Sequence, residues 1–401
     1  MNIGLFTDTY YPEINGVATS VYQLKKELEK KGHQVYVFTV SNPAVVENET
    51  HIFRMKSIPF PLFKERRVGL LSGNKWFQTI QSLNLDIIHT QTEFVIGHMG
   101  RLAAQKFHIS HIHTYHTIYE DYTHYLKVPG NEKLKGIVRL FSKHCCERAD
   151  YVVAPTDKVR SLLLGYGVKK SIHVQPTGID LSKFGHVSLN ELEKLRNRFG
   201  ITKETHVLLS IGRLSKEKNV REIIEQIPQL IQKDKHIKML IVGDGPEREN
   251  LQAYVSESNL SEYIIFVGEV PWKKIQNYYA LGDIFVNAST SETQGLTYIE
   301  ALAAGIPLLV KQDDCLKDVL QQGVNGYAFT NSEDFRHFYF ELIETVSAPY
   351  FWRTVKQSAS FCSSQAFGKN MEQIYNSVIQ QNSTLHLEEL VKYEKVRSTV
   401  G

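Results

Sequence analysis

The sequence predicts an α/β protein with two doubly wound parallel sheets, one in each half of the chain. Two observations support this fold class. Short apolar runs alternate with amphipathic helical patterns along nearly the whole sequence, which is typical of strand–helix–strand units. The length of 401 residues, of which 42% are hydrophobic, is enough for two or three domains with large cores.

The elements of the first half are predicted from apolar runs that are followed by helical periodicity. We expect strands at residues 3–7, 34–40, 51–55, 86–91, 111–116, 151–156 and 172–176. Helices are expected near residues 17–31, 97–106, 132–148 and 157–166. The second half starts after the turn-forming residues 176–180.

The second half repeats the alternation of strands and helices. Its strands are expected near residues 206–212, 238–242, 264–268, 284–288, 307–311 and 327–329, with helices between them. Helical patterns follow at about 332–346, 350–361 and 366–381, and the polar residues 382–401 are expected to form a loosely held tail. We therefore predict one domain at 1–178, a second at 179–365, and a terminal segment at 366–401.

Composition sets limits on the location of the protein. No run of about 18 apolar residues predicts a membrane span, and the N-terminus enters its first strand without the features of a signal peptide. The four cysteines have no zinc or disulfide spacing, which fits a reducing cytoplasm. Residues 1–180 carry a net charge of +6 and the remainder −3, so the first half is expected to face something anionic.

The segment from Ser291 to Glu300 is the most informative part of the chain. Gly295 opens a predicted helix, and amides at a helix N-terminus suit a phosphate group. Glu292 and Glu300 flank this point, and two such acids could hold a ribose diol and a second polyhydroxyl group. The segment alone is equally consistent with an amphipathic helix that carries two solvated glutamates.

These groups together suit a nucleotide-sugar, in which a diphosphate joins a ribose to a second sugar. A second segment strengthens this interpretation. The buried strand that ends at Ile211 is followed by Gly212, Arg213 and, five residues further on, Lys218. The Arg213 fork and the Lys218 ammonium could neutralise a diphosphate leaving group. No Asp-x-Asp sequence occurs, so we expect no metal and no cofactor: the two cations replace a metal bridge.

At these residues the chain resembles the retaining glycosyltransferases of family 4, which have the GT-B fold. The matching pieces are the Glu292–Glu300 pair, residues 212–219, residues 242–246, residues 266–268 and, at the front, residues 7–17. The resemblance runs from residue 3 to about residue 380. It implies two Rossmann-like domains that face each other across a cleft, with the last helix crossing back onto the first domain.

The resemblance also implies roles for individual residues. Arg213 and Lys218 would bind the diphosphate, Glu292 the donor sugar and Glu300 the ribose. Asn15 and Gly16 match a loop whose backbone approaches the donor phosphate, although a plain Asn-Gly turn is the alternative. His116 matches a histidine that lies near the transferred sugar. Further donor contacts are expected from the backbone of Gln294, Gly295, Leu296, Thr297, Gly268 and Val270. By contrast, His111, His113 and His124 are expected to be structural or surface residues, and residues 243–245 a structural turn.

Two basic, aromatic segments suggest a membrane lipid as the acceptor. One loop contains Phe60, Phe63, Arg66 and Arg67, and the predicted helix at 132–148 carries Lys135, Arg139 and Lys143 at four-residue spacing. Such patches adsorb to anionic headgroups. A solvated basic helix face beside an ordinary core stripe is the alternative.

The resemblance to diacylglycerol glucosyltransferases favours the lipid. It is carried by residues 292–297, with Gln294 where many relatives have Phe, and by residues 115–122. We expect the protein to transfer a hexose, glucose, from a UDP-sugar to diacylglycerol or a glycosyl-diacylglycerol. The transfer is expected at the cytoplasmic face of the membrane, and no nucleic-acid partner is expected. A soluble family 4 enzyme stays open as an alternative, as do, with less support, a sugar-nucleotide epimerase and a noncatalytic sugar-nucleotide-binding subunit.

Overall fold

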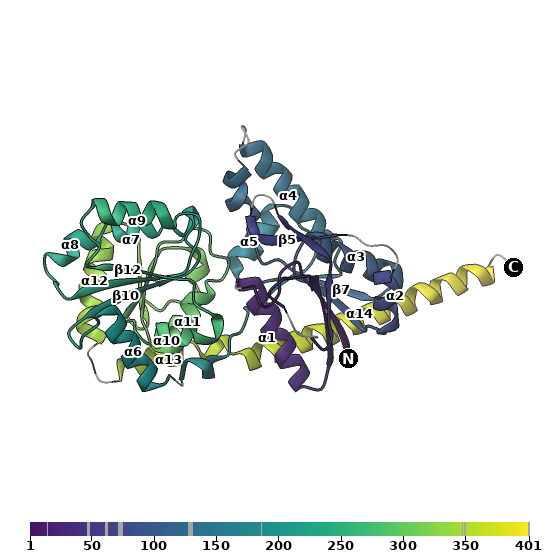
Figure 1. Cartoon of the computed structure of the whole chain (residues 1–401). Helices are drawn as coiled ribbons and strands as arrows, with labels where there is room; N and C mark the ends of the chain where they lie inside the picture. Colours follow the sequence, from purple (N-terminus) through teal and green to yellow (C-terminus); the bar gives the residue numbers. More distant parts are fainter. Residues whose placement is uncertain are drawn as a thin grey trace. The chain divides into compact units, whose positions relative to one another are not determined.

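The structure is a computed structural model. It describes residues 1–13, 15–45, 49–60, 63–70, 75–126, 131–185, 187–346, 348 and 350–399. The chain divides into two compact units, one formed by Met1–Gly178 together with Ser364–Gly401 and the other by Ile179–Ser363. Figure 1 labels their helices and strands.

The first unit is built on a seven-stranded sheet in which every pair of neighbours is parallel. Its strand order is β3-β2-β1-β6-β7-β8-β9. The strands are β1 (Asn2–Phe6), β2 (Gln34–Val40), β3 (Ile52–Met55), β6 (Ile87–Thr90), β7 (Ser110–Thr114), β8 (Tyr151–Ala154) and β9 (Ile172–Val174). The order reverses between β1 and β6, and in such sheets a ligand binds beyond the carboxyl ends of the strands at that point.

Helices cover both faces of this sheet (Figure 1). They are α1 (Gly16–Lys30), α2 (Lys75–Ser82), α3 (Val95–Phe107), α4 (Asn131–Glu147) and α5 (Asp157–Gly165), with the 3₁₀ segment η1 (Tyr119–Leu126). α1 packs on one face with α14 (Ser364–Thr399), which returns from the far end of the sequence. Phe367, Met371 and Tyr375 recur at helical spacing on α14 and are buried against the strands. The helix continues through Thr399, so the expected tail at 382–401 is helical for nearly its whole length.

A hairpin that the sequence did not predict lies beside this sheet. β4 (Ser57–Phe60) and β5 (Phe63–Gly69) pair antiparallel, with Ser57 opposite Gly69. The two prolines of this segment had favoured a loop. Pro59 is tolerated because β4 and β5 form a separate two-stranded ribbon, in which both strands are edges.

The second unit contains a six-stranded parallel sheet with the order β12-β11-β10-β13-β14-β15. The strands are β10 (His206–Ile211), β11 (Ile237–Val242), β12 (Ile264–Gly268), β13 (Ile284–Asn287), β14 (Leu308–Lys311) and β15 (Gly326–Phe329). The helices are α6 (Leu189–Phe199), α7 (Val220–Ile224), α8 (Ile227–Ile231), α9 (Arg248–Glu257), α10 (Ile275–Tyr279), α11 (Leu296–Ala304), α12 (Ser332–Val346) and α13 (Phe351–Ser358). One apolar core lies under α7, α8, α9 and α12, and the other under α6, α10, α11 and α13 (Figure 1). Here the strand order reverses between β10 and β13.

Candidate active site

The predicted diphosphate-binding and sugar-binding residues meet where the second sheet reverses its strand order. The loop after β10 carries Arg213 and Lys218, and the loop after β13 carries Glu292. β10 and β13 are hydrogen-bonded neighbours, although more than 70 residues separate the two loops. The parallel topology therefore places the cations and one carboxylate at the ligand-binding edge of the sheet.

Direct contacts join these two loops. The Lys218 ammonium donates a hydrogen bond to the Glu292 carboxylate, and both side chains are largely shielded from solvent. The Thr290 amide donates to the Glu217 carbonyl at 3.2 Å. Glu217 is itself buried, and its carboxylate accepts a bond of 2.7 Å from Ser215 Oγ. The predicted cation and the predicted sugar-binding acid are thus partners, and an incoming diphosphate would compete with Glu292 for Lys218.

The helix N-terminus predicted at Gly295 is present. Gly295 is the N-cap of α11 and has a φ of +71°, in the left-handed region where glycine is favoured. A Cβ atom here would also lie 2.3 Å from the ring of Tyr298. The amides of Leu296 and Thr297 head the helix and have no acceptor within it. Gln294 is buried next to this turn and hydrogen-bonded to Cys362, whose thiol pKa is raised to about 12 by burial.

Glu300 lies on α11 in a buried, hydrogen-bonded environment. Its carboxylate accepts a bond of 2.7 Å from the Tyr279 hydroxyl. Burial raises the Glu300 pKa, and the bond from Tyr279 opposes that change. Lys183 is the nearby cation, and burial lowers its pKa to about 8 although the Glu300 charge favours its protonated form. The Lys183 ammonium lies 3.8 Å from the centre of the Trp272 ring and donates to the Trp272 carbonyl at 2.7 Å. Lys183 was not predicted as a site residue, because no recognisable motif surrounds it in the sequence.

The glycine turn after β11 contacts the turns that follow the two neighbouring strands, β10 and β12. A Cβ on Gly243 would lie 1.9 Å from the Gly212 carbonyl oxygen, so the β11 turn has to pass close to the β10 turn. The Gly268 carbonyl accepts a bond of 2.8 Å from the Gly243 amide, and Val270 is buried. These contacts give Gly243 a structural role in the turn at residues 243–245.

In the first unit, Asn15 is a helix cap. Its side-chain oxygen accepts a bond of 2.9 Å from the Ala18 amide, and its amide group donates to Thr9 Oγ1 at 2.7 Å. Gly16 is the first residue of α1. The alternative of a plain Asn-Gly turn is therefore wrong: the pair starts α1, the first helix after β1.

His116 follows β7, a strand that pairs with β6. Its Nε2 atom lies 2.7 Å from Gln91 Oε1, and burial lowers its pKa to about 3. His111 and His113, expected to be structural or surface residues, are buried and both lie 2.9 Å from Thr90 Oγ1. The side chain of His124 lies outside the described part of the chain.

Sequence reasoning missed the polar residues after β6. Gln91 and Glu93 are 2% exposed, and Glu93 accepts hydrogen bonds from the Tyr119 hydroxyl and from His113, the latter at 3.2 Å. The signal available in the sequence was a run of polar residues, 89–93, directly after the apolar residues of a buried strand. Polar side chains at that position of a parallel sheet have to be satisfied by neighbouring elements.

The basic residues expected at a membrane are mostly engaged within the protein. Arg66 lies 3.3 Å from Glu13, and Arg67 donates to the Ser57 hydroxyl and carbonyl, both at 2.8 Å. These contacts therefore hold β5 to β4 and to the loop after β1.

On α4, Lys135 pairs with Glu132 at 2.8 Å and Arg139 with Glu120 at 2.5 Å, while Lys143 is half-buried. The alternative of an ordinary core stripe beside this basic face does not hold for all of its apolar residues. Ile137 and Leu140 are 62% and 69% exposed. Phe60 is half-buried at the end of β4, whereas the Phe63 side chain lies outside the described part of the chain.

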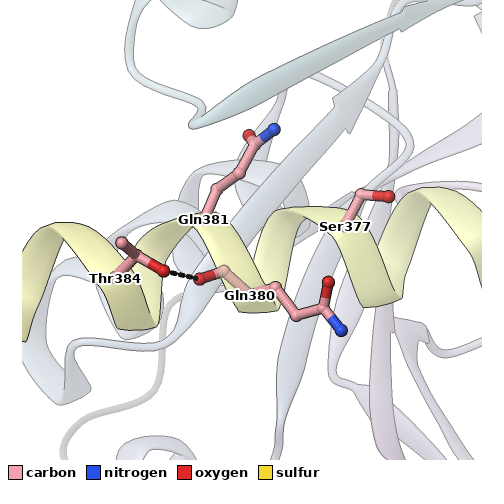
Figure 2. A pocket seen from close by; sticks show the side chains of 4 residues that line it. All are labelled: Ser377, Gln380, Gln381 and Thr384. Atoms are coloured by element: carbon pink, nitrogen blue, oxygen red, sulfur yellow. Dashed lines mark hydrogen bonds between the residues drawn. The ribbon is translucent and has the colours of Figure 1, made fainter.

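Away from these loops, a shallow pocket lies along α14. Figure 2 shows its lining, which consists of Ser377, Gln380, Gln381 and Thr384, with the Thr384 hydroxyl donating to the Gln380 carbonyl at 3.0 Å. Its four uncharged side chains offer nothing to hold a diphosphate. Among the residues that the structure describes, no group of three or more His, Cys, Asp or Glu side chains could hold a metal ion. No described helix has both the length and the apolar character needed to cross a bilayer.

Comparison with known proteins identifies the family. The model for Glycosyltransferase Family 4 matches residues 14–183, and that for Glycosyl transferases group 1 matches residues 192–339. An alpha-monoglucosyldiacylglycerol synthase of Streptococcus pneumoniae is 36% identical over 96% of this chain and 87% of its own length. The chain belongs to glycosyltransferase family 4.

A second relative supports the family, and two solved structures support the fold of this glycosyltransferase. An alpha-monoglucosyldiacylglycerol synthase of Acholeplasma laidlawii is 32% identical over 96% of this chain and 98% of its own. The structure of Anabaena Alr3699/HepE in complex with UDP has a TM-score of 0.75 at 18% identity and covers 94% of this chain and 100% of its own. Sucrose-phosphate synthase from Thermosynechococcus elongatus reaches 0.72 at 18% identity, with 95% and 99% covered. The predicted GT-B fold is thereby confirmed.

Proposed function

We propose that this glycosyltransferase moves glucose from UDP-glucose to diacylglycerol, with retention of configuration, at an anionic membrane surface. The observation that supports the proposal most is the similarity to two proteins named alpha-monoglucosyldiacylglycerol synthase, each aligned over 96% of this chain. The donor is supported by the structural neighbour Alr3699/HepE, which has been crystallised with UDP and glucose.

The donor-binding chemistry follows from the residues at the β10–β13 reversal. Arg213 and Lys218 would bind the diphosphate and stabilise the charge that develops as it leaves. The amides at the start of α11 would bind the phosphate or sugar oxygens. Glu292 would accept hydrogen bonds from sugar hydroxyls and Glu300 from the ribose. Because the cations come from the protein, we expect no metal requirement.

The transfer step then depends on positioning. The acceptor hydroxyl would attack the anomeric carbon on the face that the diphosphate leaves, and its proton would pass to the departing phosphate oxygen. Such a step needs no protein nucleophile, but it needs a held leaving group and an excluded solvent. His116, on the first unit, would contact the sugar being transferred.

The acceptor and the membrane are supported by α4. Its exposed apolar residues Ile137, Leu140 and Phe141 lie on the same helix as Lys135, Arg139 and Lys143. Burying exposed apolar side chains in the headgroup region would add to the attraction of the cations for anionic lipid. The apolar side chains, more than the ion-paired cations, would supply the binding energy.

Transfer of radiolabelled glucose from UDP-glucose by the purified protein tests this function. We expect a labelled glycolipid with diacylglycerol in anionic mixed micelles and none without diacylglycerol, and we expect the product to be lost in Arg213→Ala. Transfer to a soluble acceptor in the absence of lipid would instead support the alternative of a soluble family 4 enzyme. Release of an epimerised sugar nucleotide, or donor binding without any transfer, would support the remaining two alternatives.

A further inference from the structure

A buried chain of hydrogen bonds lies behind His116 in the first unit. His116 Nε2 contacts Gln91 Oε1 at 2.7 Å, and Gln91 Nε2 contacts His89 Nδ1 at 3.0 Å. The other nitrogen of His89 contacts Thr114 Oγ1 at 2.7 Å. The Tyr375 hydroxyl, on α14, also lies 2.7 Å from His89 Nδ1. These hydrogen bonds connect β6, β7 and the C-terminal helix α14 to His116, the residue that is expected to contact the sugar.

The orientation of the Gln91 amide, with its oxygen toward His116 and its nitrogen toward His89, gives the direction of these bonds. An amide oxygen can only accept, so the proton between His116 and Gln91 belongs to His116 Nε2. The amide nitrogen of Gln91 can only donate, so His89 Nδ1 is an acceptor and His89 carries its proton on Nε2. The Tyr375 hydroxyl then donates to the same acceptor, and His89 donates to Thr114.

The imidazole rings of His116 and His89 are both neutral near pH 7. Burial, with a smaller contribution from the neighbouring His113, lowers the His116 pKa to about 3. Burial also holds the His89 pKa well below its usual value, with smaller contributions from His116, His113 and His111. A neutral ring carries one proton, so the bond to Gln91 leaves His116 Nδ1 with a lone pair.

We propose that Gln91 is a positioning residue that holds His116 in the Nε2–H tautomer, so that Nδ1 accepts a hydrogen bond from a hydroxyl of the sugar being transferred. The tautomer follows from the contacts within the first unit alone. The contact with the sugar rests on the proposed function.

Alternative side chains at position 91 show why glutamine suits this role. A methionine of similar length would offer His116 neither an acceptor nor a donor, and the two tautomers would then be populated according to other contacts. A glutamate would keep an acceptor for Nε2–H. Comparison of Gln91→Met with Gln91→Glu therefore separates loss of the acceptor from a change in packing.

Nitrogen NMR of histidine-labelled protein without any ligand measures the tautomer directly. The His116 signals are assigned by their loss in His116→Asn. We expect a protonated Nε2 and an unprotonated Nδ1 in the wild type, a protonated Nε2 in Gln91→Glu, and a mixture of tautomers in Gln91→Met. A wild-type His116 protonated on Nδ1 alone, or a tautomer unchanged in Gln91→Met, would overturn the proposal.

Kinetics test the consequence for the reaction. A lost neutral hydrogen bond should lower kcat/KM for UDP-glucose about fivefold in Gln91→Met, and less than twofold when His116 is already alanine. Equal losses in both backgrounds would refute action through His116. Ser142→Ala is the matched control: it removes a buried hydrogen bond of 2.9 Å to the hydroxyl of Tyr115, the residue before His116, and should leave kcat/KM within twofold. If the wild type transfers no glucose, the proposed function fails while the NMR result still decides the tautomer.

Discussion

Replacement of Lys218 by alanine tests the chemistry at the joined loops of the second unit. The change removes one of the two cations expected to neutralise the leaving diphosphate. Removal of one donor to a developing negative charge costs about 3 kcal/mol, or roughly 100-fold in kcat/KM. The structure adds a second penalty: Glu292, whose side chain is 12% exposed, loses the hydrogen bond from Lys218, and its negative charge then repels the diphosphate. The expected loss is therefore at least 100-fold.

The assay is glucose transfer from UDP-glucose to diacylglycerol in anionic mixed micelles, with kcat and KM determined for each variant. Lys216→Ala is the matched control, because Lys216 is exposed in the same short segment and its loss changes the net charge equally. We expect less than a twofold effect there. Loss of a largely shielded ion pair also lowers stability, so both variants are assayed at a temperature at which thermal unfolding shows them to be folded. Equal losses in both variants, or an active Lys218→Ala, would refute the assigned role.

Three further predictions concern the fold, the metal and pH. Gly243→Ala should lower the free energy of unfolding by more than about 2 kcal/mol, because its Cβ would meet the Gly212 carbonyl, whereas Gly32→Ala, with φ +87° but open space around it, should cost about 1 kcal/mol in the same urea titration. Transfer activity should be the same with and without EDTA, and loss of activity that Mg²⁺ restores would contradict the cation mechanism. Below pH 6.5 the unfolded chain protonates His116, but the folded protein, with a pKa of about 3, does not. The free energy of unfolding should thus fall by about 2 kcal/mol between pH 6.5 and 5 relative to His116→Asn, and parallel pH profiles would contradict the depressed pKa.

Local signals in the sequence were enough to predict the strands and the helix start that carry the candidate donor site. Gly295 marks a left-handed N-cap, and the apolar run before Gly212 marks a buried strand, so the ligand-binding ends of two strands could be located from sequence. The Lys218–Glu292 contact could not, because it depends on β10 and β13 being neighbours, which is a property of the sheet order.

Several contacts in the first unit could not be predicted from short stretches of sequence. Arg66 and Arg67 were expected in a membrane-binding loop because prolines, aromatic and basic residues occur together in this segment. A two-stranded ribbon accommodates Pro59, however, and gives both arginines partners within the protein. Gln91 and His89 were missed for a different reason. Their importance comes from Thr114 on the next strand and Tyr375 nearly 300 residues away, and no short motif records such contacts.

The anomeric configuration of the lipid product tests whether this glycosyltransferase transfers glucose to diacylglycerol with retention. Purified protein is incubated with UDP-glucose labelled with ¹³C at C1 and with diacylglycerol in anionic mixed micelles, and the product is examined by NMR. The donor is α-linked, so a retaining transfer gives a single α-glucosyl-diacylglycerol, which Arg213→Ala should fail to form. A β-linked product would contradict retention, and a labelled product without diacylglycerol, or none at all, would contradict the proposed acceptor.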